Sequence, residues 1–346
     1  MNGINDKPLL SICIPTYNRG NHVYSVVNKI LQNKSNNIQI YVQDNCSEDE
    51  TKHLLTQIND PRFVYKRNKK NIGGKLNSAQ ILTNASGKFS LLCLDRDSIR
   101  INYLDKLLEI LKKNNDIIFG YCLLNVKDSM NSVIFDKGYD SLYNMAYLSK
   151  HPSGNFYNTS FLKDLKIMDK IRAKYSDSDF IHEFFNSELS HRGKSCKLNI
   201  PIIETGYTNS KSDFAKNKSY SFNTKNFYFS PLKRIEHFNE YLNEIIILKN
   251  SKYQKVKLIN KIFFQGLIYS TVSYKNFLND KYICEHYNIK STNITYIDFF
   301  KIIFFFSKSF LKNELKINLI HKLYILLSSN LKFFAYLIKH IIKELK

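Results

Sequence analysis

The stretch "FSLLCLDRDSI", residues 89–99, joins a strongly apolar run to two aspartates, Asp95 and Asp97, with Arg96 between them. The apolar part, 89–94, is typical of a buried β-strand. In a parallel sheet, the residues that follow a strand lie at its carboxyl edge, which is where ligands bind. Two like charges so close together repel each other, so the sequence predicts a positive group between the two carboxylates.

A divalent metal ion is the positive group that suits this pair. Mg²⁺ and Mn²⁺ prefer carboxylate and phosphate oxygens and keep open positions for a substrate. We therefore predict a site for Mn²⁺ or Mg²⁺ and a diphosphate, in which one of the two carboxylates ligates the ion and the other meets it through water or contacts a sugar. The alternative interpretation is a solvated strand end, because a D-x-D tripeptide by itself is common.

The first hundred residues alternate β-rich runs with helix-like stretches. This alternation predicts an α/β fold with a doubly wound, mostly parallel, Rossmann-like sheet. The predicted strands are 9–14, 38–43, 63–66 and 89–94, and the predicted helices are 21–32, 48–58 and 75–85. Further along we expect strands at 117–124 and 132–135, a turn at 151–155, a helix within 175–194, and a strand and loop over 195–206.

Composition limits the classes of partner. The chain has 346 residues, of which 51 are Lys or Arg and 30 are Asp or Glu, so its formal net charge is +21. Such a charge favours nucleic acid, an anionic membrane surface or phosphorylated small molecules. The 23 Tyr and 25 Phe could stack nucleic-acid bases, but no recognised nucleic-acid motif is present, so we expect no nucleic acid as partner. The six cysteines are scattered without a C-x-x-C pair, which fits a reducing cytoplasm.

The composition changes near residue 230, where Pro and Gly nearly disappear and Phe, Ile, Leu, Tyr and Lys dominate. We therefore predict one domain over 1–229, with halves at about 1–100 and 101–229, and an all-helical, basic domain over 230–346. No run reaches the length of about 18 uncharged apolar residues that spans a bilayer, and the N-terminus lacks the pattern of a signal peptide.

The last predicted helix is amphipathic and basic. Two interpretations stay open: the apolar side packs inside a helical domain, which could also form oligomers, or it lies on an anionic membrane surface. The apolar side is predicted to hold Phe334, Leu337, Ile338, Ile341, Ile342 and Leu345, opposite Lys332, Lys339, Lys343 and Lys346.

Five features in order over 9–100 resemble the glycosyltransferase family 2 enzymes, which have the GT-A fold. A "P-x-Y-N-R" turn follows the first strand, an aspartate and a small polar turn ("QDNCSED") follow the second, and an "N-x-G" precedes an Asn-containing helix and "A-x-G". The apolar strand and D-x-D come next, and the resemblance weakens to about 205. The matching residues are Pro15, Thr16, Tyr17, Asn18 and Arg19; Asp44; Asn71, Gly73, Asn77, Ala85 and Gly87; and Asp95 and Asp97.

The resemblance implies a nucleotide-diphospho-sugar donor, with a UDP-sugar as the expected one. Asp44 would hold the base or ribose, Asp95 the ribose or sugar, and Asp97 the metal. Asn71 and Gly73 have a structural alternative, a turn that leads into a helix. The residues expected around the donor are Pro15, Thr16, Tyr17, Asn18, Arg19, Asp44, Asn71, Gly73, Lys75, Asn77, Asp95, Arg96 and His151. His151 belongs to "HPSG", which is similar to a loop below the acceptor site in some capsule and O-antigen transferases, and a local loop role is its alternative.

Inverting transfer needs a base that removes the proton of the acceptor hydroxyl. Many family members carry this base in an "E-D" pair that opens a helix, and this sequence departs from that pattern. Asp179 is the preferred candidate because a helix N-terminus would hold it ionised. Asp177 and Glu183 are the alternatives, and N-capping or solvation is the structural explanation for the two that are not the base.

These features predict a metal-dependent inverting glycosyltransferase of bacterial surface polysaccharide biosynthesis (capsule or O-antigen). We expect a saccharide acceptor, lipid-linked, and a cytoplasmic, peripheral location at the inner face of the cell membrane. Wall teichoic acid or a protein is the alternative acceptor. Other classes are a basic nucleic-acid-binding protein and a scaffold with an inactive catalytic part, against which the intact Asp95 and Asp97 argue.

Overall fold

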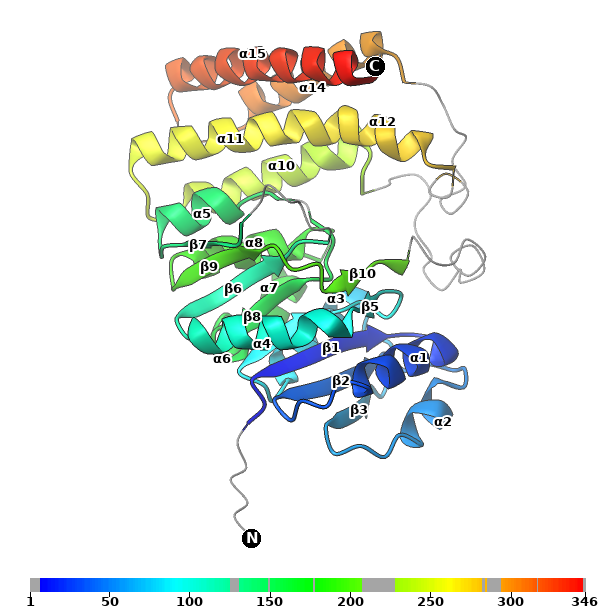
Figure 1. Cartoon of the computed structure of the whole chain (residues 1–346). Coiled ribbons are helices and arrows are strands. Elements are labelled where there is room, and N and C mark those ends of the chain that lie inside the picture. The colour runs from blue at the N-terminus through cyan, green and yellow to red at the C-terminus, as the bar shows by residue number, and fades with distance from the viewer. Residues whose placement is uncertain are drawn as a thin grey trace. The chain divides into compact units, whose positions relative to one another are not determined.

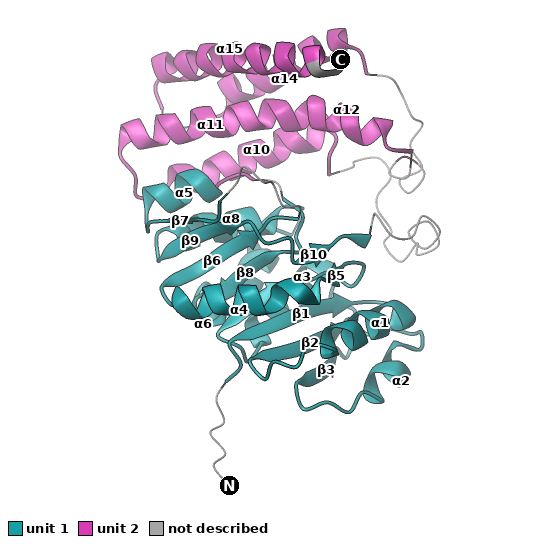
Figure 2. Cartoon of the chain, in the orientation of Figure 1, with its two compact units in different colours: residues 1–145, 149–210 teal, residues 146–148, 211–346 magenta. Residues whose placement is uncertain are grey.

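The computed structural model describes residues 7–124, 131–148, 150–176, 178–206, 228–281, 284, 294–315 and 317–344. The chain divides into two compact units, which Figure 2 colours separately. Unit 1 comprises Met1–Met145 and Ser149–Ser210, and unit 2 comprises Ala146–Leu148 and Lys211–Lys346. Unit 1 is an α/β layered structure, and the described part of unit 2 is helical (Figure 1).

The centre of unit 1 is a mixed sheet, for which the described residues supply eight strands in the order β3-β2-β1-β4-β8-β6-β9-β7. The pairs β1–β2, β2–β3, β1–β4 and β6–β9 are parallel, whereas β8 runs antiparallel to β4 and β6, and β7 to β9. The strands are β1 (Leu10–Thr16), β2 (Ile38–Asp44), β3 (Phe63–Arg67), β4 (Phe89–Leu92), β6 (Ile117–Cys122), β7 (Val133–Phe135), β8 (Asn155–Asn158) and β9 (Lys194–Leu198).

Helices cover this sheet because its strands are apolar on both faces. Leu10, Ile12, Ile14, Ile40 and Val42 are buried in one cluster with residues of the flanking helices. The mostly parallel α/β fold that the sequence predicts is therefore confirmed. The helices of unit 1 are α1 (Gly20–Leu31), α2 (Thr51–Thr56), α3 (Gly74–Asn84), a 3₁₀ turn (Ile101–Tyr103), α4 (Leu104–Lys113), α5 (Tyr139–Met145), α6 (Thr159–Asp164), α7 (Ile167–Ala173) and α8 (Ile181–Ser190).

A second, two-stranded sheet follows the D-x-D stretch. β5 (Ser98–Ile99) pairs antiparallel with β10 (Ile203–Glu204), and Arg100 N donates to Ile202 O at 2.8 Å beside it. This pairing brings the end of the 195–206 segment next to Asp97. Two parts of the chain that lie a hundred positions apart are thereby held together at the carboxyl edge of the large sheet.

Unit 2 contains packed helices with an aromatic core. Phe238, Phe263 and Phe306 meet from three helices, with ring centroids 4.6 Å apart for Phe238–Phe306 and 5.2 Å for Phe263–Phe306. Gly266 permits this packing, because a Cβ there would lie 2.4 Å from a ring carbon of Phe306. The described helices are α10 (Pro231–Ile246), α11 (Lys252–Ser270), α12 (Val272–Asn279), α14 (Tyr296–Lys312) and α15 (Leu319–Glu344).

Helix α15 differs from the sequence prediction in two respects. Its buried face holds Ile325, Phe333 and Leu337, whereas Ile338 and Ile342, predicted on the same side as Leu337, are exposed. The second is that Leu319–Ile342 is long and apolar enough to cross a membrane by length and composition, although it holds no uncharged run of the predicted length. Lysines interrupt its apolar sequence without ending the helix, so a search for an uncharged run misses it.

Candidate functional site

The ends of the parallel strands define one edge of the large sheet, where the predicted site residues gather. Thr16 pairs with Asp44 and Asp44 with Arg67, so these three strand ends stand in a row. Because β8 is antiparallel to its neighbours, its amino end lies at the same edge. The turn before β8 therefore joins the loops that follow β1, β2, β3, β4 and β9.

Asp95 is held by two side chains from the end of β1. Thr16 Oγ1 donates to its Oδ2 and Arg19 Nη1 donates to its Oδ1, both at 3.0 Å. The Asp95 and Arg19 side chains are 5% and 9% exposed, so this is a buried ion pair. The positive group that the sequence demands near the aspartates is thus, for Asp95, an arginine of the same chain.

Asp97 is completely buried and is surrounded by donors of a different kind. Ser153 Oγ donates to Oδ2 at 2.5 Å, and the Gly206 backbone N–H donates to Oδ1 at 3.2 Å. The Nε2 atom of His151 lies 3.6 Å from Oδ2. Asp97 shares none of these partners with Asp95, so the two carboxylates are held separately.

His151 presents a definite ring nitrogen to Asp97. Its Nδ1 accepts the backbone N–H of Ser153 at 3.2 Å, so in the neutral ring the proton resides on Nε2, the atom that faces the carboxylate. Burial lowers the pKa of His151, against the opposing effect of Asp97, and Arg96 lowers it further. At neutral pH the ring is uncharged, and its Nε2–H is a hydrogen-bond donor toward Asp97 or a bound ligand.

Two close backbone contacts fix the loops around Asp97. Gly154 has φ +96° and its N–H donates to Leu92 O at 3.0 Å, which anchors the turn before β8 to the end of β4. A Cβ on Gly206 would lie 2.0 Å from the carbonyl oxygen of Arg96, so any larger residue would push β10 away. Ser153 also accepts the Leu94 N–H at 2.9 Å, which makes its hydroxyl a bridge between the β4 end and Asp97.

The donor set permits one protein carboxylate on a divalent ion. In the described part of the chain, no group of three or more His, Cys, Asp and Glu side chains is arranged as a metal site. Asp95 is already paired with the cation of Arg19, whereas the close donors of the buried Asp97 carboxylate are neutral. Each carboxylate has about four lone-pair positions, so Asp97 keeps one for a metal that otherwise binds water and diphosphate oxygens, as Mg²⁺ does.

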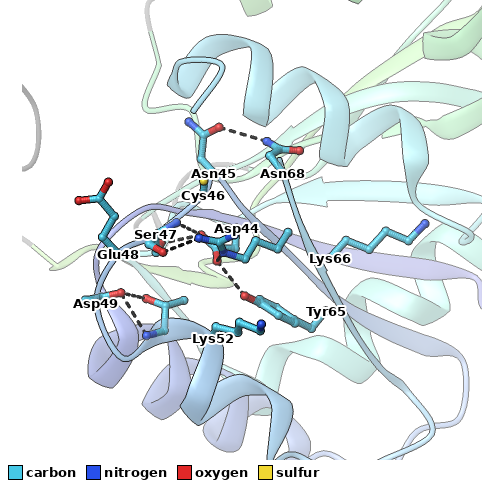
Figure 3. A network of polar contacts seen from close by, with 12 residues as sticks. Asp44, Asn45, Cys46, Ser47, Glu48, Asp49, Lys52, Tyr65, Lys66 and Asn68 are labelled. Carbon is cyan, nitrogen blue, oxygen red and sulfur yellow. Dashed lines mark hydrogen bonds and ion pairs between the residues drawn. The ribbon is translucent and has the colours of Figure 1, made fainter. Parts of the chain in front are cut away.

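Asp44 is the centre of a polar network at the end of β2, which Figure 3 shows. Its Oδ1 accepts from Ser47 N and Oγ at 2.8 and 2.6 Å, and its Oδ2 accepts from Tyr65 Oη at 2.7 Å. Arg67 Nε lies 3.3 Å from Oδ2. The Asp44 side chain is fully buried, so in this structure it shapes the 44–50 loop through these bonds.

Asn71 and Asn77, both predicted around the donor, belong to a chain of amide contacts below this loop. Asn45 Nδ2 donates to Asn71 Oδ1 at 2.7 Å, and Asn68 Nδ2 donates to Asn77 Oδ1 at 3.0 Å. Asn71 Oδ1 also accepts the N–H of Gly73, whose φ of +85° favours glycine. This geometry agrees with the structural alternative for Asn71 and Gly73, in which they form a turn that leads into α3.

The "PTYNR" turn is clamped onto the 44–50 loop. Asn18 has a left-handed backbone (φ 53°), and its side-chain oxygen accepts Glu48 N at 2.8 Å. Ser47 Oγ accepts Asn18 N at 2.8 Å rather than capping a helix, because α2 begins only at Thr51. Pro15 lies buried in β1, and Tyr17 is half-buried directly after it.

The structure brings the preferred base candidate next to a predicted donor contact. Lys75, in the first turn of α3, donates from Nζ to Ser176 O at 2.8 Å and lies 3.7 Å from Asp179 Oδ1. The Asp179 side chain is 43% exposed. Glu183 lies in the first turn of α8 and is buried, and Asp177 lies outside the described residues. Asp179 precedes the cap residue of α8, Phe180, by one position.

The sequence did not predict four residues that contact Asp44 or Asp97: Tyr65, Arg67, Ser153 and Gly206. Ser153 belongs to the "HPSG" turn, but the sequence of a turn does not indicate that its serine contacts a buried carboxylate. Gly206 acts through its backbone only, and its role depends on the pairing of β5 with β10. Tyr65 and Arg67 read as ordinary strand residues.

Comparison with known proteins agrees with this geometry. Residues 11–171 match the family model described as glycosyl transferase family 2. The chain is 25% identical over 191 residues to a GalNAc(5)-diNAcBac-PP-undecaprenol β-1,3-glucosyltransferase of Campylobacter jejuni, covering 53% of this chain and 58% of that protein. It is 33% identical over 119 residues to the UDP-Glc:α-D-GlcNAc-diphosphoundecaprenol β-1,3-glucosyltransferase WfgD of Escherichia coli, covering 34% of this chain and 46% of that protein.

The fold has solved counterparts. S. aureus TarS 1-349, in complex with UDP-GlcNAc, superposes with a TM-score of 0.55 at 15% identity, covering 87% of this chain and 81% of that chain. The chain spans about half the length of the two curated relatives it matches. The D-x-D edge, the turn after β1 and the match to the family model together make residues 11–171 similar to the glycosyl transferase family 2 enzymes.

Proposed function

We propose that this protein is an inverting glycosyltransferase that moves a sugar from a nucleotide-diphospho-sugar, a UDP-sugar, to a saccharide acceptor. The observation that carries the proposal is the pair Lys75–Asp179 at the edge of the sheet that also holds Asp97. A cation for a diphosphate and a solvent-accessible carboxylate for a hydroxyl proton then stand at one edge. Inverting transfer needs a base for the hydroxyl proton, and a lysine can stabilise charge on the departing diphosphate.

The donor would lie across the loops at this edge. Pro15 and Tyr17 would line the base, and Asp44 would act by holding the 44–50 loop that meets the base or ribose. Lys75 and the Nε2–H of His151 would donate toward diphosphate oxygens. Arg19 and Thr16 would keep Asp95 oriented toward the ribose or sugar, as the resemblance to the family implies.

Asp97 is the residue that would hold Mn²⁺ or Mg²⁺. A bound divalent ion offsets negative charge on the departing diphosphate. The hydrogen bonds from Ser153 and the Gly206 N–H would hold the Asp97 carboxylate in one orientation, with a lone pair left for the ion. His151, with its proton on Nε2, is a hydrogen-bond donor in this arrangement.

In the chemical step, Asp179 takes the proton of the acceptor hydroxyl as its oxygen attacks the anomeric carbon. The new C–O bond forms on the face opposite the diphosphate, and the bond from that carbon to the diphosphate oxygen breaks, so the electron pair leaves with the nucleoside diphosphate. Lys75 lies 3.7 Å from Asp179, so the cation proposed for the diphosphate and the proposed base would act side by side.

The acceptor is proposed to be a lipid-linked saccharide of bacterial surface polysaccharide biosynthesis. The support is the set of relatives, two of which are named for transfer to undecaprenol-diphosphate-linked saccharides. The enzyme would then work at the inner face of the cell membrane. Its basic helical unit is consistent with that location.

Asp179→Asn tests the proposal. UDP-, GDP-, CDP- and dTDP-sugars are first screened by thermal shift with and without Mn²⁺, since a ligand that binds only the folded state raises its melting temperature. With the stabilising donor, Asp179→Asn should reduce kcat by about 10²–10⁴-fold while the thermal shift stays unchanged. Asp169→Asn, which removes an exposed acid on α7, is the matched control and should be fully active.

Asp97→Ala should abolish the Mn²⁺-dependent part of the thermal shift. Retention of more than a tenth of the activity in Asp179→Asn would refute the assigned base. Donor stabilisation that keeps its Mn²⁺ dependence in Asp97→Ala would refute the metal assignment, and no stabilisation by any nucleotide-sugar would refute the donor class.

A further inference from the structure

Helices α14 and α15 expose many large apolar side chains. We define the outer apolar face as Phe300, Phe304, Ile320, Leu327, Leu331 and Ile338, each between 57% and 75% exposed. The α15 members are spaced by seven, four and seven residues, which aligns them along one side of the helix. Large contiguous apolar patches on a protein surface mark contact sites for another apolar body.

The face is continuous across the two helices. The rings of Phe300 in α14 and Phe334 in α15 have centroids 5.9 Å apart, which joins the two stripes. The helices pack on the rest of unit 2 through other residues: Phe306 and Phe310 of α14 meet Phe238 and Phe263, and Ile325 and Phe333 of α15 are fully buried. The outer apolar face is therefore additional to the packing face.

Lysines border this face and indicate what covers it. Lys301, Lys308 and Lys312 recur at spacings of seven and four along α14, so they form a line beside Phe300 and Phe304, and the Lys301 side chain is 69% exposed. From Ser230 to the end the chain has 19 Lys and Arg against 8 Asp and Glu, a net charge of +11. Two copies meeting through this face would bring like charges together, whereas anionic lipid headgroups would neutralise them.

We propose that the outer apolar face docks on an anionic lipid surface, with α14 and α15 lying in the plane of the membrane. An amphipathic helix with lysines beside an apolar stripe enters the headgroup and acyl boundary in this way. The proposal extends the membrane location given above and is independent of the transfer chemistry, so Asp179→Asn should bind vesicles like the wild type.

The packing of α15 favours an in-plane helix over a spanning one. Along its buried face, Ser329 Oγ donates to Asn260 O of α11 at 2.9 Å, and Ser328 Oγ accepts from Asn260 Nδ2 at 3.2 Å. α11 also carries Lys257 and Lys261, so a bilayer crossing by α15 would either break this interface or take those charges into hydrocarbon.

The test uses the full chain with vesicles of phosphatidylcholine, alone or with one third phosphatidylglycerol. Sedimentation should show binding to the anionic vesicles that weakens with salt. Leu327→Asp with Leu331→Asp should reduce the partition coefficient at least about tenfold. Asn36→Asp with Asn59→Asp changes the charge equally at exposed positions of unit 1 and should leave binding nearly unchanged.

A fluorescence measurement keeps the test independent of folding defects. The chain contains no Trp, so Leu327→Trp supplies a single indole. Its emission should shift to shorter wavelength on anionic vesicles and be quenched by brominated acyl chains. The control Tyr253→Trp, at a 75% exposed position of α11 outside the outer apolar face, should show neither effect.

Three results would overturn the proposal. The first is unchanged vesicle binding by the Leu327→Asp, Leu331→Asp variant. The second is a stable dimer in light scattering that the same variant dissociates, with no vesicle binding by the wild type, which would assign the face to a second copy. The third is binding that resists alkaline carbonate and needs detergent for release, which would indicate a spanning helix.

Discussion

Replacing Ser153 by Ala removes the hydroxyl that links the end of β4 to Asp97. The side chain is fully buried, donates to Asp97 Oδ2 at 2.5 Å and accepts from Leu94 N at 2.9 Å. A hydrogen bond to a charged group contributes about 1.5–3 kcal/mol and a neutral one about 1 kcal/mol, and Asp97 stays buried when its bond is lost. We therefore expect the free energy of unfolding to fall by about 3 kcal/mol.

The same change should weaken the metal site, because partners of a ligating carboxylate typically contribute 10–100-fold in metal affinity. Urea unfolding gives the stability, and Mn²⁺ titration of the thermal shift gives the affinity. Ser90→Ala is the matched control: this serine is equally buried, but its hydroxyl reaches Tyr157 O only at 3.5 Å, so its loss should cost less than about 1 kcal/mol. A Ser153→Ala protein within about 0.5 kcal/mol of the wild type would refute the reasoning.

Two further predictions concern the same unit. Gly206→Ala places a Cβ 2.0 Å from the Arg96 carbonyl, so we expect a loss of about 1–3 kcal/mol in unfolding free energy and a smaller Mn²⁺ thermal shift; a wild-type Mn²⁺ response would contradict the role of the Gly206 N–H. Burial lowers the pKa of His182 to about 4, and its Nδ1 lies 2.9 Å from Tyr157 Oη. Between about pH 4 and about pH 6.5 the imidazole is protonated in the unfolded chain but neutral in the folded one. The free energy of unfolding should therefore fall by at most about 3 kcal/mol as the pH drops from about 6.5 to 4. In His182→Gln, the free energy of unfolding measured with urea should change less over this pH range than in the wild type. An equal pH dependence in the two proteins would show that another group is responsible.

The parallel half of the sheet could be predicted from the sequence because its strands are continuous apolar runs. The expected runs 9–14, 38–43 and 63–66 correspond to β1, β2 and β3 within a few residues. β8 was missed, since "NFYN" is short and half polar and is buried only through its position between β4 and β6. β5 and β10, two residues each, exist only through their pairing with each other.

The candidate site was predictable where chemistry and sequence order coincide, as in D-x-D and the turn after β1. What the sequence could not supply is the choice of partner for each carboxylate. Whether Arg19 or a metal meets Asp95 depends on the register of β1 against β4, which places Thr16 and Asp95 equally far beyond the paired Cys13 and Leu92. The approach of Lys75 to Asp179 likewise requires the folded positions of α3 and the residues before α8.

The hydrogen bond from the Gly206 N–H to Asp97 limits how this protein can be altered. Because the donor is a main-chain amide, a side-chain substitution elsewhere does not exchange it for another donor, whereas a change in chain length does. Deleting one residue between Asn199 and Ile202 would shift the pairing of β10 with β5 by one residue. A different backbone amide would then face Asp97 Oδ1, and the side chains of β10 would exchange faces. Insertions and deletions in this short segment are therefore changes that would replace the amide donor of the buried acid.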